Sequence, residues 1–263
     1  MTRLCPLFSG SSGNSYYIGS ANDGILIDAG RSAKQIENAL RVNDLDIKNV
    51  RAIFITHEHS DHVQGLRVLA SRHKIKVYSS MGTISALEEK NLINEKVDIS
   101  PITLDGVEAG GMNIVPFRIS HDCCEGFGYV VETADGRKTA FATDTGYISA
   151  DIKSALCGCD TVVIESNHDV RMLENGIYPY ILKRRILSDI GHLSNDSCAD
   201  ELLELVNSGT TRFLLAHLSR ENNMPELALQ TSLCNLESHG MKQNTDFMLS
   251  VAPVENTAGS IIY

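Results

Sequence analysis

The chain has 263 residues, of which 43% are hydrophobic and 21% charged, a composition typical of a soluble globular protein. No apolar run approaches the roughly 20 residues that span a bilayer, and the N-terminus lacks the apolar stretch of a signal peptide, so we expect a cytoplasmic protein. The net charge of −10 argues against a broad basic face that grips duplex DNA, but it does not exclude a phosphate-bearing substrate at a metal centre.

The first half of the chain predicts strands that alternate with helices. Short strands are expected at 16–18 and 24–28, and a helix at 35–40. A strand rich in β-branched residues at 50–56 is followed by a helix over 63–71, whose apolar residues share one face.

The second half has the same rhythm, and the whole chain is expected to form a single α/β domain over residues 1–263. The dipeptide Asp135-Gly136 predicts a hairpin turn, and Ser194 is placed to cap a helix. The expected elements are strands at 112–120, 126–133, 137–143, 161–165 and 212–216, and helices at 195–206 and 225–237.

Polar residues occur repeatedly where an expected strand ends. Rigid strands direct the residues that follow them to a common edge, so catalytic groups collect there. Core packing does not explain six polar residues in equivalent places. These residues are Asp28, His57, His121, Asp144, Glu165 and His217.

The run His57-Glu58-His59-Ser60-Asp61-His62 is the strongest chemical signal. Imidazole nitrogens and carboxylate oxygens are ligands for zinc, manganese or iron, and one short loop can serve two metals. His57 and His59 could hold one metal, and Asp61 with His62 a second. The alternative is a solvated turn with Asp61 at a helix start, which does not account for three histidines in six residues.

A dinuclear site needs further ligands, one of which bridges the metals. Asp144, in Thr-Asp-Thr-Gly after an apolar strand, is the natural bridging carboxylate, although an aspartate in this place can also cap a turn or a helix. His121 and His217 would complete the two coordination spheres. Taken singly, each could be a structural histidine.

The motif T-H-E-H-S-D-H-V-x-G, with L-I-D-A-G before it and T-D-T-G after it, resembles the metallo-β-lactamase superfamily. This resemblance implies a four-layer αββα sandwich of two mixed β-sheets. It also implies that Asp28 supports a ligand from behind. The metal ligands that it implies are His57, His59, Asp61, His62, His121, Asp144 and His217.

Further motifs resemble the YycJ/WalJ type of single-domain metallo-hydrolase, which is related to ribonuclease Z and to phosphoribosyl cyclic phosphodiesterases. They are L-F-S-G-S-S-G-N-S at the start, then E-S-N-H-D, R-R-I, G-H-L-S-N and A-H-L-S. The resemblance implies 5′-to-3′ exonuclease activity, with DNA ends as the nucleic-acid partner.

Phosphodiester chemistry gives several residues an expected role. Two metals can generate a bridging hydroxide and stabilise both the attacking and the leaving oxygen. Asp61 could orient that hydroxide. His192 could protonate the leaving alkoxide, since imidazole titrates near neutral pH, or it could simply bond to the backbone. Glu165 could orient a ligand histidine.

Other polar residues are candidates for substrate binding. Arg184 and Arg185 could clamp a phosphate, although Lys183-Arg184-Arg185 is also an ordinary charged helix face. The loop at 10–14 could offer N–H groups to an anion, or it could be only a tight turn. The remaining candidates are Asn14, Asn167, His168 and Asn195.

Two other functions remain open from the sequence. The same ligands would serve a hydrolase of a small-molecule thioester, lactone or cyclic phosphate. A non-catalytic binding module of this fold would be expected to lose ligands, whereas all of them are present here.

Overall fold

The computed structural model describes residues 2–262, which fold into two compact units. Of the described residues, the first unit contains 2–116, 123–137 and 253–262, and the second contains 117–122 and 138–252. The expectation of a single domain over residues 1–263 stays a prediction. No helix among the described residues is long and apolar enough to cross a membrane.

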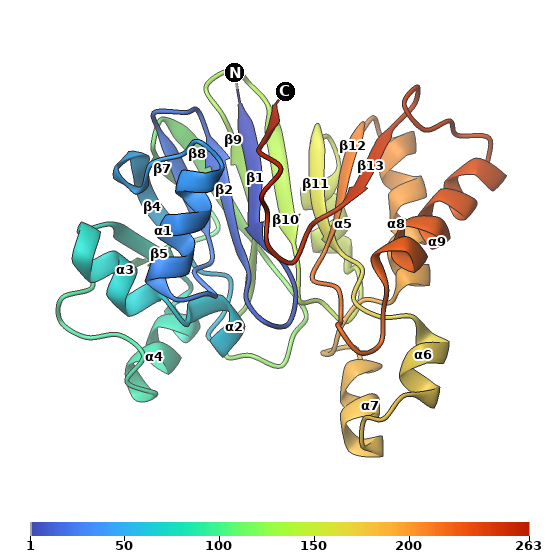
Figure 1. Cartoon of the computed structure of the whole chain (residues 1–263), viewed down its shortest axis with the longest axis horizontal. Helices are drawn as coiled ribbons and strands as arrows, with labels where there is room; N and C mark the ends of the chain where they lie inside the picture. Colours follow the sequence, from blue (N-terminus) through green and yellow to red (C-terminus); the bar gives the residue numbers. More distant parts are fainter. Residues whose placement is uncertain (1, 263) are drawn as a thin grey trace. The chain divides into compact units, whose positions relative to one another are not determined.

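The first unit begins with an antiparallel meander and continues with strands that alternate with helices (Figure 1). Its elements are β1 (Arg3–Phe8), β2 (Ser15–Gly19), β3 (Gly24–Ile27), α1 (Ala33–Val42), the 3-10 helix Ile47–Asn49, β4 (Val50–Phe54), α2 (Ser60–Val63), α3 (Leu66–His73), β5 (Lys76–Ser79), α4 (Met81–Glu89), β6 (Ile99–Pro101), β7 (Val107–Ala109), most of β8 (Met112–Arg118), β9 (Phe127–Glu132) and β14 (Ile261–Ile262).

The second unit is built mainly of parallel strands joined by helices, with α9 packed on α8. Its elements are β10 (Lys138–Ala142), α5 (Ala150–Leu156), β11 (Thr161–Glu165), α6 (Val170–Asn175), α7 (Tyr180–Ile186), α8 (Asn195–Asn207), β12 (Arg212–Ala216), α9 (Pro225–Ser238) and β13 (Met248–Val251).

The strands form two mixed seven-stranded sheets, in the orders β14-β1-β2-β3-β4-β5-β6 and β13-β12-β11-β10-β9-β8-β7. In the first sheet β1, β2 and β3 pair antiparallel, and β3 to β6 pair parallel. Every residue of β3 and β11 is buried. Strands buried on both faces read as continuous apolar runs, which is why Ile25-Leu26-Ile27 and Val162-Val163-Ile164 show no alternation.

Most predicted elements lie where the sequence placed them, with ends shifted by one or two residues. The six strand-end residues are confirmed: Asp28 and His217 follow β3 and β12 directly, and Glu165 is the last residue of β11. Ser194 caps α8, since its side chain accepts a hydrogen bond from the Ser197 N–H.

The prediction of one helix over 63–71 was wrong, because the structure has α2 and α3 with a break at Gln64-Gly65. Gly65 lies against the backbone of a distant segment. A Cβ at Gly65 would stand 2.1 Å from the Arg31 carbonyl oxygen, and the Gly65 N–H donates to the Ala29 carbonyl. The helix is interrupted where it must approach this segment closely.

Candidate metal centre

In the first unit, four side chains of the types that bind metals follow β4 and enter α2; we call His57, His59, Asp61 and His62 the HxHxDH cluster. The ring centroid of His57 lies 4.5 Å from that of His59 and 4.1 Å from that of His62. An Asp61 carboxylate oxygen lies 3.4 Å from His62 Nε2. Glu58 does not join them, since its carboxylate accepts a hydrogen bond from the Cys124 N–H at 3.1 Å.

Asp28 and Thr56 hold this cluster from behind. Asp28 is buried and accepts from His62 Nδ1 at 2.7 Å and from the Thr56 N–H at 2.8 Å. The Thr56 hydroxyl lies 3.1 Å from His57 Nδ1. Burial raises the pKa of Asp28, and the His62 imidazole opposes that rise. A histidine whose Nδ1 donates to a carboxylate keeps a lone pair on Nε2, the arrangement that metal-ligating histidines use.

Replacement of Asp28 by asparagine is expected to weaken metal affinity about 10- to 100-fold, as is usual for partners that orient a ligand from behind. Asp28 has a left-handed backbone, φ 62°. Asp44, also left-handed at φ 56° but exposed, provides a matched Asp→Asn control. Competition with a chromogenic chelator measures both affinities, and equal affinities would remove Asp28 from the support of the site.

Asn14 contacts the same cluster. Its Nδ2 lies 3.2 Å from an Asp61 carboxylate oxygen and 3.1 Å from His62 Nε2, and its backbone N–H donates to the Asp61 carbonyl. Gly30 makes this close approach feasible, because a Cβ there would stand 1.7 Å from the Asp61 carbonyl oxygen. The structure therefore places Asn14, predicted to bind substrate, against two predicted metal ligands.

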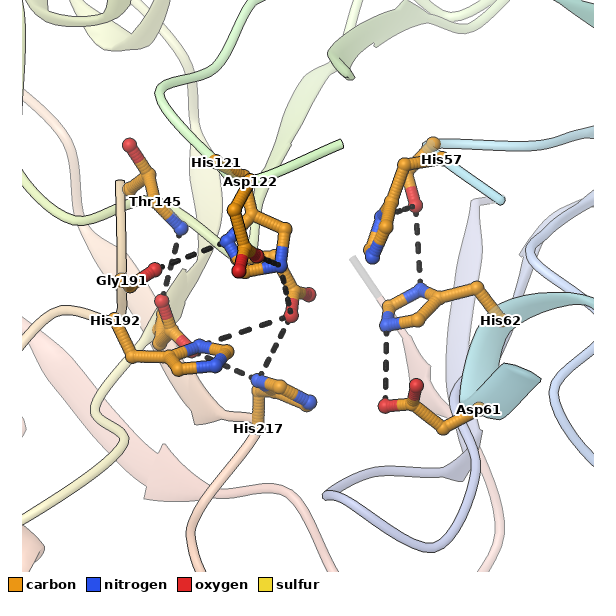
Figure 2. A network of polar contacts seen from close by, with 12 residues as sticks. His57, Asp61, His62, His121, Asp122, Thr145, Gly191, His192 and His217 are labelled. Atoms are coloured by element: carbon orange, nitrogen blue, oxygen red, sulfur yellow. Dashed lines mark hydrogen bonds and ion pairs between the residues drawn. The ribbon is translucent and has the colours of Figure 1, made fainter. Parts of the chain in front are cut away.

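The second unit brings together another group of ligand types, which we call the Asp-Glu-His cluster: Asp144, Glu165, His192 and His217. One donor atom from each lies within 4.8 Å of one donor atom from every other. The labelled rings of His192 and His217 lie beside each other in Figure 2, with centroids 5.4 Å apart. Asp144 Oδ1 lies 3.3 Å from His217 Nδ1.

Glu165 organises this cluster. Its Oε1 accepts from the Nδ1 atoms of both His192 and His217, each at 2.8 Å, and its Oε2 accepts from the Thr145 and Leu193 N–H groups. Burial alone would raise the pKa of Glu165, but these imidazoles hold it well below its usual range. A single ionised carboxylate thus fixes both rings, with the Nε2 atom of each directed away from it.

His121 also belongs to the second unit. Its Nδ1 lies 3.0 Å from the Gly191 carbonyl oxygen, to which it donates, and its Nε2 lies 3.8 Å from Asp144 Oδ1 (Figure 2). The Gly191 carbonyl therefore selects the tautomer in which Nε2 carries the lone pair. His121 and His62 are alike in that the Nδ1 of each is anchored to an oxygen of the protein.

The two arginines predicted to clamp a phosphate, Arg184 and Arg185, have different surroundings in the structure. Arg185 is exposed and paired with Asp122, including a bond from its NH2 group at 2.7 Å. Arg184 is also exposed. Within residues 2–262 its guanidinium has no ion pair. The adjacent arginines of α7 therefore differ in what they can offer a phosphate.

Asn167 and Asn195 are buried and committed to the protein. Asn167 Nδ2 donates to the His217 carbonyl at 2.9 Å, which fixes the backbone at that histidine. Asn195 accepts from the Ser166 hydroxyl at 2.7 Å and exchanges hydrogen bonds with Asn223. Both contacts suit residues that support the ends of β11 and β12.

His168 is 1% exposed, and within residues 2–262 neither ring nitrogen has a hydrogen-bond partner. Burial lowers its pKa from 6.5 to about 4, with Glu165 opposing and His192 reinforcing the shift. Between pH 4 and 6.5 the unfolded chain therefore binds a proton that the native chain excludes. The stability that the neutral native imidazole contributes is present above pH 6.5 and lost as the pH falls towards 4.

In metal-free protein, this group is expected to remove about 3 kcal/mol from the free energy of unfolding between pH 7 and pH 4. Urea unfolding at several pH values measures the effect in the wild type and in His168→Gln, which cannot titrate. The variant should show a shallower fall in this window. Parallel curves for the two proteins would mean that His168 is not excluded from protonation.

Two threonines at these clusters were not predicted from the sequence. Thr56 places its hydroxyl between two histidines, and Thr145 donates its N–H to Glu165. Each is next to a predicted ligand, within the motifs T-H-E-H and T-D-T-G, and that adjacency was the available signal.

All donors in both clusters are imidazole nitrogens or carboxylate oxygens, a set that fits zinc, manganese or iron and is typical of a dinuclear metal site. Such a set, at the ends of strands of two mixed sheets, defines a metal-dependent hydrolase. Residues 24–218 match the model of the Beta-lactamase superfamily domain. The chain belongs to this family.

Two similar proteins support the assignment to the metal-dependent hydrolases. The chain is 40% identical over 236 residues to exodeoxyribonuclease YycJ of Bacillus anthracis, covering 89% of each chain. It is 37% identical over 245 residues to exodeoxyribonuclease WalJ of Streptococcus pneumoniae serotype 2, covering 92% of this chain and 90% of that one. The recognised resemblance to the YycJ/WalJ type is confirmed.

A solved structure supports the fold. The Zn²⁺-bound PqqB of Methylobacterium extorquens superposes with a TM-score of 0.74 at 14% identity, over 100% of both chains. At this identity the likeness concerns the fold alone. It confirms the predicted metallo-β-lactamase fold of two mixed sheets flanked by helices.

Proposed function

We propose that this protein is a dinuclear metal-dependent exodeoxyribonuclease that degrades DNA from the 5′ end. The observation that carries the proposal is the likeness to two named exodeoxyribonucleases over about nine-tenths of the chain. The proposed reaction is hydrolysis of a phosphodiester at a DNA end.

We assign the two clusters to one centre within a single domain. We propose that seven residues would hold two divalent ions: His57, His59, Asp61, His62, His121, Asp144 and His217. The family membership and the nitrogen and oxygen donors support this assignment. We propose zinc or manganese as the ions, with iron compatible with the same ligands.

When bound there, two divalent ions would lower the pKa of a water and would stabilise charge on the attacking and leaving oxygens. The residues of the chain do the rest. Asp61, held by Asn14, orients the attacking oxygen. His192, 12% exposed and anchored through Nδ1 to Glu165, donates a proton from Nε2 to the leaving oxygen.

Substrate contacts follow from exposure and from existing bonds. Arg184 can pair with a phosphate without breaking a bond, whereas Arg185 must first leave Asp122 or act together with it. His168 is 1% exposed, so although its ring nitrogens lack partners among residues 2–262, it is assigned to the support of the site and not to contact with substrate. Asn14, Asn167 and Asn195 are assigned to positioning the residues that touch substrate.

The protein is proposed to act in the cytoplasm. All seven cysteines are free thiols, three of them exposed, and such thiols persist in a reducing compartment.

The test is a panel of substrates incubated with purified protein and Mn²⁺ or Zn²⁺. DNA labelled at the 5′ end is expected to lose its label as mononucleotide, faster than matched RNA. The panel also contains a thioester, a lactone and a cyclic nucleotide. Turnover of one of these without release of nucleotide from DNA would replace the proposal with a small-molecule hydrolase.

A further inference from the structure

A groove borders the HxHxDH cluster at Asp61 and extends away from its histidines. Its volume is about 450 Å³, within the usual range for ligand pockets. Three segments of the first unit line it: the loop before β2, the helical run from α2 into α3, and the turn after α4 at Asn91-Leu92. The residues that matter here are Ser11, Ser12, Ser60, Asp61, Gln64 and Arg67.

The loop presents two hydroxyls next to Asp61. Gly10 and Gly13 have φ angles of 123° and 149°, which turn the chain tightly around Ser11 and Ser12. The following residue, Asn14, bonds to the Asp61 backbone and carboxylate. The serines are therefore held beside the carboxylate and are not carried on a free loop.

The helical run presents a row of side chains to the same groove. Ser60 lies in α2, Gln64 at the break that follows it and Arg67 in α3, and all three line the groove. Gln64 and Arg67 are exposed. Within residues 2–262 the Arg67 guanidinium makes no ion pair or hydrogen bond, whereas Arg51 and Arg72 each pair with a carboxylate.

The chemistry of the lining favours an anion. Asp61 is the only carboxylate that lines the groove among the described residues, and it belongs to the HxHxDH cluster. The other polar groups are hydroxyls, amides and one guanidinium, and a guanidinium offers five N–H donors and no acceptor atom. In a chain with a net charge of −10, the formal charges of this groove balance, with Arg67 against Asp61.

We propose that this groove binds a phosphate of the substrate strand other than the one being cleaved, with Arg67 as its cationic contact. The inference rests on the proposed nuclease function. It explains how an acidic protein holds a polyanion: the strand is held at discrete phosphates near the metal centre, without a broad basic face.

The test uses the full chain with Mn²⁺ and single-stranded oligonucleotides in which one linkage at a time is an uncharged methylphosphonate. Arg67→Ala is expected to lower kcat/KM for the unmodified strand about tenfold, the usual effect of a charged hydrogen bond. It should reduce the slope of log kcat/KM against log salt by about 0.7. Arg72→Ala, on the same helix and paired with Glu37, is the charge-matched control.

One non-scissile methylphosphonate should slow the wild type about tenfold and cause no further loss in Arg67→Ala. If the wild type degrades the strand and no linkage shows this coupling, or if Arg72→Ala loses as much as Arg67→Ala, the groove proposal is overturned alone. If the wild type does not degrade the strand, the nuclease proposal falls and the groove proposal falls with it.

Discussion

Replacement of His59 by alanine is expected to abolish practical activity, with a loss in kcat/KM of about three orders of magnitude or more. A bound metal supplies several kcal/mol of transition-state stabilisation, and each 1.36 kcal/mol is a factor of ten. His59 is half-buried at the edge of the HxHxDH cluster, so its removal should perturb packing less than removal of the buried His57 or His62. Metal content, measured by mass spectrometry after dialysis, should fall in the same variant.

The control is His73→Ala, at the end of α3, where the imidazole lies 2.8 Å from Glu37. This variant also removes one histidine from the first unit, and it should keep wild-type metal content and activity. Equal rates of nucleotide release by wild type and His59→Ala would contradict the assignment of catalysis to the HxHxDH cluster.

Replacement of His192 by alanine is expected to lower kcat on DNA by about 10²- to 10⁴-fold, the range found for general acids. The leaving oxygen of a deoxyribose is a strong base and needs a proton. The 4-nitrophenyl ester of thymidine 5′-phosphate releases a weakly basic phenolate that needs none. The loss on this ester should therefore be below tenfold, since only the proton transfer has been removed.

His239→Ala serves as the matched control, because His239 is exposed and lies 2.8 Å from the Asn235 carbonyl. It should leave both substrates unaffected. Metal content in His192→Ala should match the wild type, because the proposed ligand set does not include His192. Equal losses on DNA and on the nitrophenyl ester would rule out proton donation by His192.

The parts of the site that are close together in the sequence could be predicted. The His57–His62 run is recognisable from its ligand chemistry, and the other candidates are recognisable because they follow expected strands. Hydrogen bonds and ion pairs between residues far apart in the sequence could not be predicted. Glu165 accepts from His192 and His217, which are 27 and 52 residues away, and Arg185 pairs with Asp122 across 63.

The same distinction applies to the fold. The apolar runs of β3, β4 and β11 identify buried strands without further information. The break between α2 and α3 depends on the Arg31 carbonyl, 34 residues before Gly65, so periodicity alone predicted one continuous helix. The periodicity of a helix indicates which of its faces is buried, but it does not indicate where a close contact with another segment interrupts the helix.

Three of the strand-end residues carry a backbone conformation that L-amino acids seldom adopt: Asp28, Asp144 and His217 have φ angles of 62°, 59° and 54°. Left-handed residues of this kind cost on the order of 1 kcal/mol each, and glycine would remove the cost. The protein therefore gives up stability at the positions where it needs these side chains. Selection for thermal stability alone would be expected to favour glycine at these positions. The resulting protein would be more stable but would lack the side chains that the proposed reaction needs.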